Sequence, residues 1–255
     1  MKQKPLIFIT NDDGISAPGI HRLAEAASTL GEVVVVAPDG PKSGQASAIT
    51  VDSPLRLTEV DFGGNIEAYS VNGTPVDCVK LGMHAVMRDR RPDILLSGIN
   101  HGPNSGNSVI YSGTMGAVIE GNFVGIPSVG FSLLDHHHDA DFSPVIPWII
   151  RITAKVLESG LPKDVCLNVN FPKGCEPKGM RMAVGARGHW TEEYAEYVSP
   201  HGKPFYLLTG HYINDDPDDP TTDNYWLDRG WGTIVPVRPD QTAFDHVKGL
   251  EYLTL

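Results

Sequence analysis

The chain is poor in features that would each define a class of protein. No run of apolar residues approaches the roughly 18 that a membrane-spanning helix needs, and the first residues lack the apolar stretch of a signal peptide. Only 20 lysines and arginines stand against 31 aspartates and glutamates, for a formal net charge of −11, and no basic run exists to neutralise a phosphate backbone. We therefore expect neither a membrane protein nor a binder of nucleic-acid duplexes.

Cysteine and the common nucleotide-binding motifs are scarce as well. Cys78, Cys166 and Cys175 are scattered and form no C-x-x-C pair, which is typical of a reducing compartment, so we expect a cytoplasmic protein. No G-x-G-x-x-G follows the first apolar run, and the chain has no P-loop and no G-x-S-x-G elbow. These absences argue against a dinucleotide enzyme, a P-loop NTPase and a serine hydrolase of the elbow type.

What the chain does contain is an alternation of apolar strands and amphipathic helices. Pro5–Thr10 and Glu32–Ala37 are short apolar or β-branched runs, and Pro18–Leu30 between them has helical spacing of its apolar residues. A β-α-β unit of this kind opens a doubly wound fold. The further predicted elements are a hairpin (Leu55–Val60 and Ile66–Val71), helices at Pro75–Met87, Gly113–Phe123 and Pro144–Gly160, and strands at Asp93–Ser97, Pro127–Leu133 and Val165–Asn170.

The pattern changes near residue 172. Residues 1–172 predict an α/β core, a parallel or mixed sheet with helices on both faces. Residues 173–255 mix glycine, proline, aromatics and charges with short alternating segments, and they predict a small β-rich extension that includes oligomerisation elements.

Three polar clusters follow predicted strands, and in open α/β sheets ligands bind beyond the carboxyl ends of the strands. The first contains Asp12 and Asp13, followed by Gly14, whose backbone freedom allows the two carboxylates to converge. Converging carboxylates repel each other unless a cation lies between them, and hard oxygen ligands select Mg²⁺, Mn²⁺ or Ca²⁺. The alternative is that one aspartate caps the next helix and the other is solvated.

The other two clusters would contribute neutral oxygens and backbone N–H groups. One is residues 38–44, and the other is the long segment 97–114, rich in glycine and asparagine, which ends in Ser112, Gly113 and Thr114 before a predicted helix. Glycines permit close backbone approach, and a helix N-terminus attracts phosphate. The alternative for this segment is a surface Ω-loop with an ordinary helix cap.

These motifs, taken in order, resemble a known family. TNDDG at 10–14, APGI at 17–20, Ser43-Gly44, SGIN-x-G-x-N-x-G at 97–106 and YSGT-x-GA-x-x-EG at 111–121 closely resemble the stationary-phase survival protein family SurE. The likeness continues in GKPFY at 202–206 and in residues 221–242, so it extends over nearly the whole chain. Several separated motifs in the same order make the resemblance specific.

The resemblance implies a Rossmann-like three-layer sandwich that acts as a metal-dependent 5′- and 3′-nucleotidase, in dimers or tetramers with exchanged C-terminal elements. One divalent cation per subunit, Mg²⁺ or Mn²⁺ (or Ca²⁺ in a crystal), is expected. Some family members also cleave short polyphosphate. Carried over to this sequence, the metal ligands fall on Asp12, Asp13, Ser43 and Asn100, the catalytic groups on Asp12, Asp13 and Asn104, and the phosphate-binding groups on Asn11, Gly44, Asn104, Ser112, Gly113 and Thr114.

The expected reaction is hydrolysis of a nucleoside monophosphate by a metal-activated water. One alternative makes Asp12 or Asp13 a nucleophile, although aspartyl-phosphate enzymes usually space their aspartates one residue apart. Another is a non-catalytic sensor that binds metal and nucleotide. Two departures from the family pattern bear on this choice: Asn107-Ser108 replaces the usual acidic residue, and Ser199-Pro200-His201-Gly202 replaces a stretch that carries an arginine.

Overall fold

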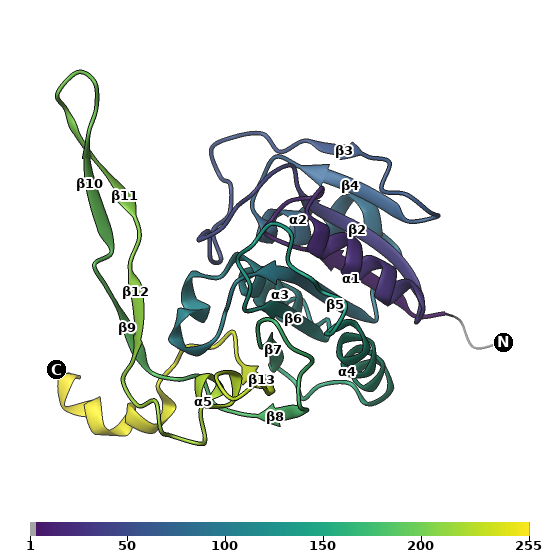
Figure 1. Ribbon diagram of the computed structural model, residues 1–255. Coiled ribbons are helices and arrows are strands. Elements are labelled where there is room, and N and C mark those ends of the chain that lie inside the picture. The colour runs from purple at the N-terminus through teal and green to yellow at the C-terminus, as the bar shows by residue number, and fades with distance from the viewer. Residues whose placement is uncertain (1–3, 255) are drawn as a thin grey trace.

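A nine-stranded mixed sheet forms the centre of the computed structural model, which describes residues 4–254. The order across the sheet is β3 (Leu57–Glu59), β4 (Glu67–Val71), β2 (Glu32–Pro38), β1 (Leu6–Thr10), β5 (Ile94–His101), β6 (Ser128–Leu133), β7 (Cys166–Phe171), β13 (Gly232–Val237) and β8 (Met180–Met182) (Figure 1). The six neighbouring strands from β4 to β7 run parallel, while β3 lies antiparallel at one edge and β13 lies antiparallel to β7.

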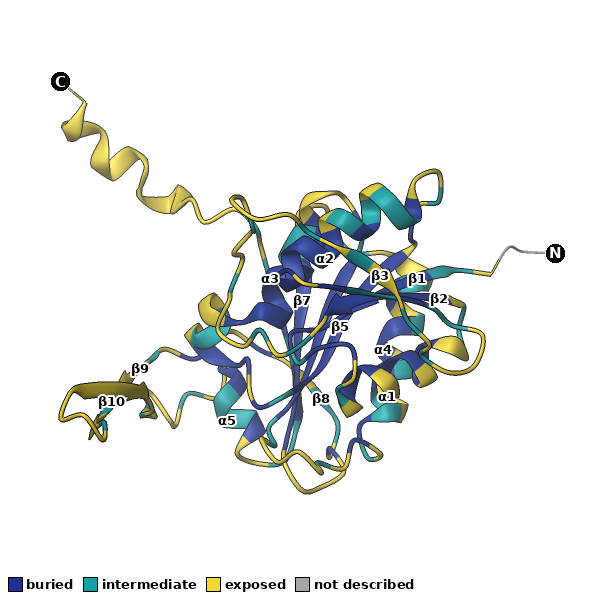
Figure 2. Ribbon diagram, turned by 90° about the horizontal axis from the view of Figure 1, so that it is seen from above, coloured by how far each residue is buried: buried dark blue, intermediate teal, exposed yellow. Residues whose placement is uncertain are grey.

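Helices cover both faces of this sheet. α1 (Pro18–Ser28) and α4 (Ile146–Ser159) pack on one face, and α2 (Pro75–Leu81) and α3 (Gly113–Phe123) pack on the other. The alternation along β1 divides the core accordingly, because Ile7 and Ile9 face α1 and α4 whereas Phe8 faces α2 and α3. Figure 2 shows the buried strands between two layers of helices. The predicted doubly wound α/β sandwich is therefore confirmed.

The predicted elements of the core are found at nearly their predicted bounds. α3 spans the predicted residues, and β3 and β4 pair as the predicted antiparallel hairpin. The predicted helix over 75–87 is regular only to Leu81 and continues as a wider π-helical turn over Gly82–Met87. A Cβ on Gly82 would lie 2.6 Å from the Phe8 ring, so glycine allows this turn to approach β1 closely.

The prediction for the third parallel strand was wrong at its end. The sequence places the end of the strand at Ser97 and reads Asn100 as part of a loop. In the structure β5 continues to His101, with a shift of register between Ser97 and Asn100. Gly98 takes a positive φ of 133°, which lets the backbone bulge and then resume pairing with β6. Asn100 therefore stands on the sheet, beside Ser132.

The chain after residue 172 both extends the sheet and leaves it. β8 and β13 continue the central sheet beyond β7, although both follow residue 172. The predicted division of the chain at that residue stays a prediction. The arm, residues 186–215, projects from the body (Figure 1) and is followed by a short helix, α5 (Asp223–Leu227). Its strands are β9 (Gly188–Thr191), β10 (Tyr194–Val198), β11 (Pro204–Leu208) and β12 (His211–Asn214).

The C-terminal segment lies apart from the body. Its short 3₁₀ turns, η3 (Phe244–His246) and η4 (Lys248–Leu253), have no buried residues and extend away from the sheet in Figure 2. Within the described residues, no helix is both long and apolar enough to cross a membrane.

Candidate active site at the carboxyl edge of the sheet

The three polar clusters meet where β1, β2 and β5 end. The Lys42 N–H, from the loop after β2, donates to the Asp12 carbonyl at 2.7 Å. The His101 N–H, at the end of β5, donates to the Asp13 carboxylate at 3.2 Å. The side chain of Thr114, in the first turn of α3, reaches Asp12 as well. The convergence predicted from strand order is thus present in the fold.

Asp12 is the more buried of the two aspartates. Its carboxylate accepts a 2.6 Å hydrogen bond from Thr114 Oγ1 and lies against Gly113, where an added Cβ would be 2.8 Å from the Asp12 Cβ. The pKa of Asp12 is raised to about 6, chiefly by burial; the Thr114 hydroxyl lowers it, and the nearby Asp13 charge contributes to the rise. A buried carboxylate next to a second carboxylate is a favourable place for a cation.

Asp13 is only partly buried, and its carboxylate faces the end of β5. Burial also raises the pKa of Asp13, while the His101 N–H and the His101 ring lower it. The two carboxylates are therefore held by different elements: Asp12 is bonded to α3, and Asp13 is bonded to the end of β5. Both groups come from the turn that Gly14 makes with a φ of 99°.

Asn100 and Ser43, the neutral members of the predicted ligand set, are each next in the chain to a residue whose backbone N–H bonds one of the aspartates. The amide nitrogen of Asn100 donates to the Gly102 carbonyl at 2.9 Å, so its amide oxygen is the atom that remains to ligate a cation. Ser43 is exposed and follows Lys42, whose N–H is anchored on Asp12. Two carboxylates with an amide and a hydroxyl form a hard oxygen set that suits Mg²⁺ or Mn²⁺. Among residues 4–254 no three His, Cys, Asp or Glu side chains are grouped to hold a metal ion.

Asn104 is fixed to the sheet beside this set. Its side-chain nitrogen donates to Ser132 Oγ at 2.8 Å, and its backbone N–H donates to Asn170 Oδ1 at 2.9 Å. Its carbonyl accepts from Asn168 Nδ2 at 2.7 Å. Asn104 is thus held at three points although it lies in an irregular segment.

Ser112, Gly113 and Thr114 form the start of α3, which points its N-terminus at Asp12. Ser112 caps the helix by accepting a hydrogen bond from the Met115 N–H at 3.0 Å. Its own hydroxyl proton is left to donate elsewhere. The N–H groups of the first turn and the helix dipole create a favourable position for a phosphate next to the carboxylates.

The two remaining predicted phosphate-binding residues are placed differently. Asn11 is fully buried, and its amide group bonds both the N–H of Gly14, at 3.2 Å, and the carbonyl of Gly14, at 2.9 Å. We therefore assign Asn11 to shaping the turn that presents the aspartates. Gly44 is exposed, has a φ of 74° and lies one residue after Ser43.

One departure from the family pattern contacts the arm, and the other lies on it. Asn107 contacts the base of the arm with both ends of its amide. Residues 199–202 form the turn between β10 and β11, closed by a 2.8 Å hydrogen bond from the Ser199 N–H to the Lys203 carbonyl. This turn is at the far tip of the arm (Figure 1). The long hairpin carries it away from the sheet edge.

Sequence reasoning missed a row of polar side chains that support the site. Ser132 on β6 pairs with Asn100 on β5 and with Asn170 on β7. Asn170 Nδ2 in turn donates to Asn168 Oδ1 at 2.9 Å. The alternation in CLNVNF, with two asparagines on one face of a predicted strand that is otherwise apolar, was the available signal.

The chain is similar to known proteins over nearly its whole length. The family model described as "Survival protein SurE" matches residues 7–192. A protein of Phocaeicola vulgatus named 5′-nucleotidase SurE is 45% identical over 250 residues, covering 98% of this chain and 97% of its own. One of Christiangramia forsetii with the same name is 46% identical over 258 residues, covering 100% and 98%. The crystal structure of the SurE protein from Aquifex aeolicus matches with a TM-score of 0.84 and 36% identity, over 98% of this chain and 99% of that one.

Proposed function

The chain belongs to the SurE family, and from that membership we propose that it is a 5′-nucleotidase, which hydrolyses nucleoside 5′-monophosphates to nucleoside and phosphate. We extend the proposal to metal dependence and to 3′-monophosphates. The observation that carries it is the Asp12–Asp13 pair beside the N-terminus of α3, because this arrangement would allow a cation and a phosphate to bind next to each other.

Asp12, Asp13, Ser43 and Asn100 would hold one divalent cation, Mg²⁺ or Mn²⁺. The donor set fits such an ion, since the raised pKa of Asp12 has burial as its main cause and a bound cation would offset that cost. When bound, the cation would neutralise charge on the phosphoryl group and activate a water for attack. Without it, the two carboxylates would repel the phosphate.

The phosphoryl oxygens that do not face the cation would be bound by hydrogen-bond donors of the protein. Asn104, the Ser112 hydroxyl and the first N–H groups of α3, at Gly113 and Thr114, would donate to them and stabilise the charge that builds up in the transition state. Attack by water forms one P–O bond while the ester P–O bond breaks and the nucleoside leaves with a proton. Gly44, which has a φ of 74°, would contribute its backbone N–H from the loop after β2.

The test is phosphate release from a panel of 5′- and 3′-nucleoside monophosphates with Mg²⁺, with Mn²⁺ and with EDTA, for wild type and Asp13→Asn. We expect release that needs metal and is lost in the variant. Release that survives both EDTA and the substitution would exclude the metal mechanism. Nucleotide binding without release would support a sensor, and a phosphoenzyme trapped on an aspartate would support the nucleophilic alternative.

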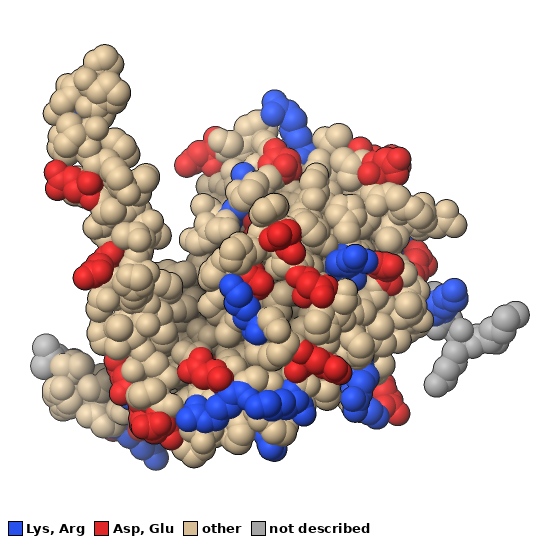
Figure 3. Space-filling model, viewed as in Figure 1, with Lys and Arg blue, Asp and Glu red and all other residues tan. Residues whose placement is uncertain are grey.

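We also propose that the protein is a homodimer or homotetramer assembled through the arm and the C-terminal segment. Leu208 and Val198 on the arm are 73% and 66% exposed, and Leu253 near the C-terminus is 64% exposed. Figure 3 shows few charges along the arm and a recess between the arm and the body. Exposed apolar surface of this kind is typical of an interface between subunits.

The substitution Leu208→Glu tests this assembly. It should shift the sedimentation coefficient towards that of the monomer, and an unchanged value would exclude the arm from the interface.

The cytoplasmic location stays a prediction.

A further inference from the structure

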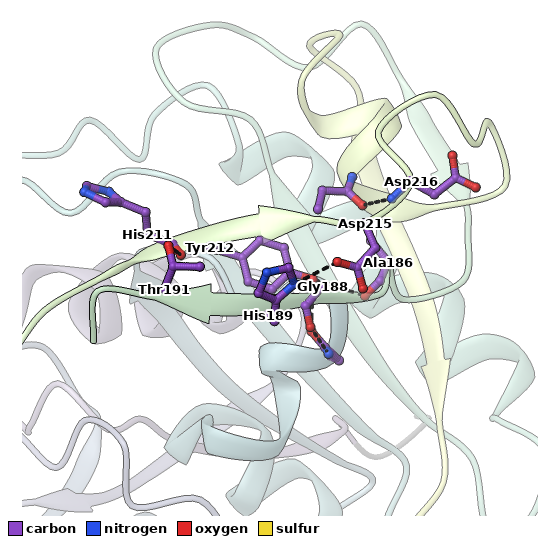
Figure 4. A network of polar contacts seen from close by, with 10 residues as sticks. Ala186, Gly188, His189, Thr191, His211, Tyr212, Asp215 and Asp216 are labelled. Carbon is purple, nitrogen blue, oxygen red and sulfur yellow. Dashed lines mark hydrogen bonds and ion pairs between the residues drawn. The ribbon is translucent and has the colours of Figure 1, made fainter. Parts of the chain in front are cut away.

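The base of the arm is bonded to the loop that carries Asn104. Asn107 Nδ2 donates to the Gly188 carbonyl at 2.6 Å, and its backbone N–H donates to the Ala186 carbonyl at 2.9 Å. Gly188 and Tyr212 lie on the two paired strands at the base of the arm, β9 and β12 (Figure 4). Tyr212 Oη, from the opposite strand β12, donates to Asn107 Oδ1 at 2.9 Å. Asn107 is exposed, so its position is fixed by these hydrogen bonds to the arm and not by packing in the core.

Asp223 also connects the loop that carries Asn104 to the base of the arm. Its carboxylate accepts from the Gly106 N–H at 2.7 Å and from the Ala186 N–H at 2.9 Å. The side chain is fully buried, and burial raises its pKa while these hydrogen bonds lower it. A buried carboxylate shared by two backbone segments holds them together, because each lost hydrogen bond leaves the buried charge less well compensated.

Gly106 makes this close contact possible. A Cβ at that position would lie 2.8 Å from Tyr212 Oη and 3.0 Å from the Ala186 carbonyl oxygen, and its φ is 61°. The arm and the loop therefore touch through backbone at this point. The only residue between Gly106 and Asn104 is Ser105, so a shift of the arm would be passed on to Asn104 over a very short length of chain.

The loop is thus bonded on two sides, to Ser132, Asn168 and Asn170 of the sheet through Asn104, and to the arm through Gly106 and Asn107.

We propose that Tyr212, Asn107 and Asp223 are positioning residues for the phosphohydrolase reaction, which hold the loop so that Asn104 meets the phosphoryl group. This inference rests on the proposed function. Asn107, which stands where the family usually has an acidic residue, therefore connects the arm to the site in this chain.

The test compares Tyr212→Phe with Tyr206→Phe. Phenylalanine at 212 removes only the hydroxyl and keeps the ring that packs edge-on against Trp190, with centroids 5.8 Å apart. Tyr206 is on the same arm and 58% exposed, so it is a matched control. We expect kcat for the best nucleotide to fall about fivefold or more in Tyr212→Phe, with KM changed less than twofold and no change in Tyr206→Phe.

Two further readouts separate positioning from general weakening. Asn107→Ala should lower kcat at least as much, because it removes the bond to the Gly188 carbonyl as well as the bond from Tyr212. Adding Tyr212→Phe to it should have a smaller effect than the same substitution in the wild type, because the bond that the two side chains share is already lost. Amide hydrogen exchange should show faster exchange at residues 106 and 107 in Tyr212→Phe and unchanged exchange in the α4 helix.

The exchange and kcat measurements together can overturn the positioning role. Faster exchange at 106 and 107 with unchanged kcat overturns the proposal, as does a lower kcat with unchanged exchange, or additive effects of the two substitutions. If the wild type releases no phosphate from any nucleotide, the proposed function fails and no reaction remains for these residues to position. Unchanged exchange with an active wild type overturns the positioning role alone.

Discussion

Thr114 Oγ1 donates a 2.6 Å hydrogen bond to Asp12 Oδ1, and this contact joins the end of β1 to the first turn of α3. Both side chains are almost completely buried. The carboxylate that would ligate the cation and the helix that would bind the phosphate are therefore parts of one rigid unit. The helix N-terminus also favours the ionised form of the carboxylate.

Replacing Thr114 by valine tests that contact. Thr114→Val keeps the shape but leaves Asp12 without its hydroxyl donor, and hydrogen bonds to charged groups contribute roughly 1.5–3 kcal/mol. We expect phosphate release to fall by tenfold or more and the metal concentration for half-maximal activity to change. Thr114→Ser is the control and should retain most of the activity. Full activity in the valine variant would show that Asp12 needs no donor from α3.

Gly113→Ala tests how closely the helix approaches Asp12. The new methyl group would lie 2.8 Å from the Asp12 Cβ and 2.9 Å from its Oδ2, closer than carbon atoms pack. We expect the carboxylate to be displaced and nucleotidase activity to be nearly lost. Gly249→Ala, where a Cβ has no neighbour within 4 Å, should behave as wild type. A crystal structure of the Gly113 variant with Asp12 unmoved would contradict this explanation.

Ser132 and Ser128 offer a matched pair on one strand. Both are buried and hydrogen-bonded, but Ser132 accepts from Asn104 whereas Ser128 Oγ donates to the Ile126 carbonyl at the other end of β6. Each alanine substitution should cost about 1 kcal/mol in unfolding free energy, measured by urea titration. We expect Ser132→Ala alone to lower kcat, by about fivefold. Equal effects on kcat would mean that the loss comes from stability and not from Asn104.

The sequence was sufficient for the core because its signals were local. The helical spacing in α1, the continuous β-branched run in β2 and the glycine after Asp13 each determine structure within a few residues. Polar clusters after successive strands then predicted which segments would meet, since parallel strands place their carboxyl ends at one edge.

The remaining features depend on contacts between distant residues. Asn104 and Asn170 are 66 positions apart, and Asn107 and Tyr212 are 105 positions apart, so no local pattern predicts either contact. The bulge that brings Asn100 onto the sheet depends on pairing with β6, which outweighs the loop preference of its glycine and asparagine neighbours. For the same reason the role of Asn107 became visible only in the folded chain.

The raised pKa of Asp12 makes the stability of the metal-free protein depend on pH. A carboxyl group with a pKa near 3.9 unfolded and about 6 folded favours folding while protonated, and that contribution is lost as pH rises through about 6. The shift corresponds to about 3 kcal/mol. Asp12→Asn removes the charge and keeps an oxygen to accept from Thr114, so in EDTA its advantage in unfolding free energy over wild type should grow between pH 4 and pH 7.

Urea unfolding in EDTA at several pH values measures this difference directly, without reference to activity. At pH 8, adding Mn²⁺ or Mg²⁺ at 100 times its dissociation constant should restore about 2.7 kcal/mol to the wild type, because the ion binds only the folded protein. The same addition should leave Asp12→Asn nearly unchanged. A difference between the two proteins that stays constant from pH 4 to pH 8 would show that Asp12 ionises in the fold as easily as in the unfolded chain, and the electrostatic reason for a cation at this site would then be lost.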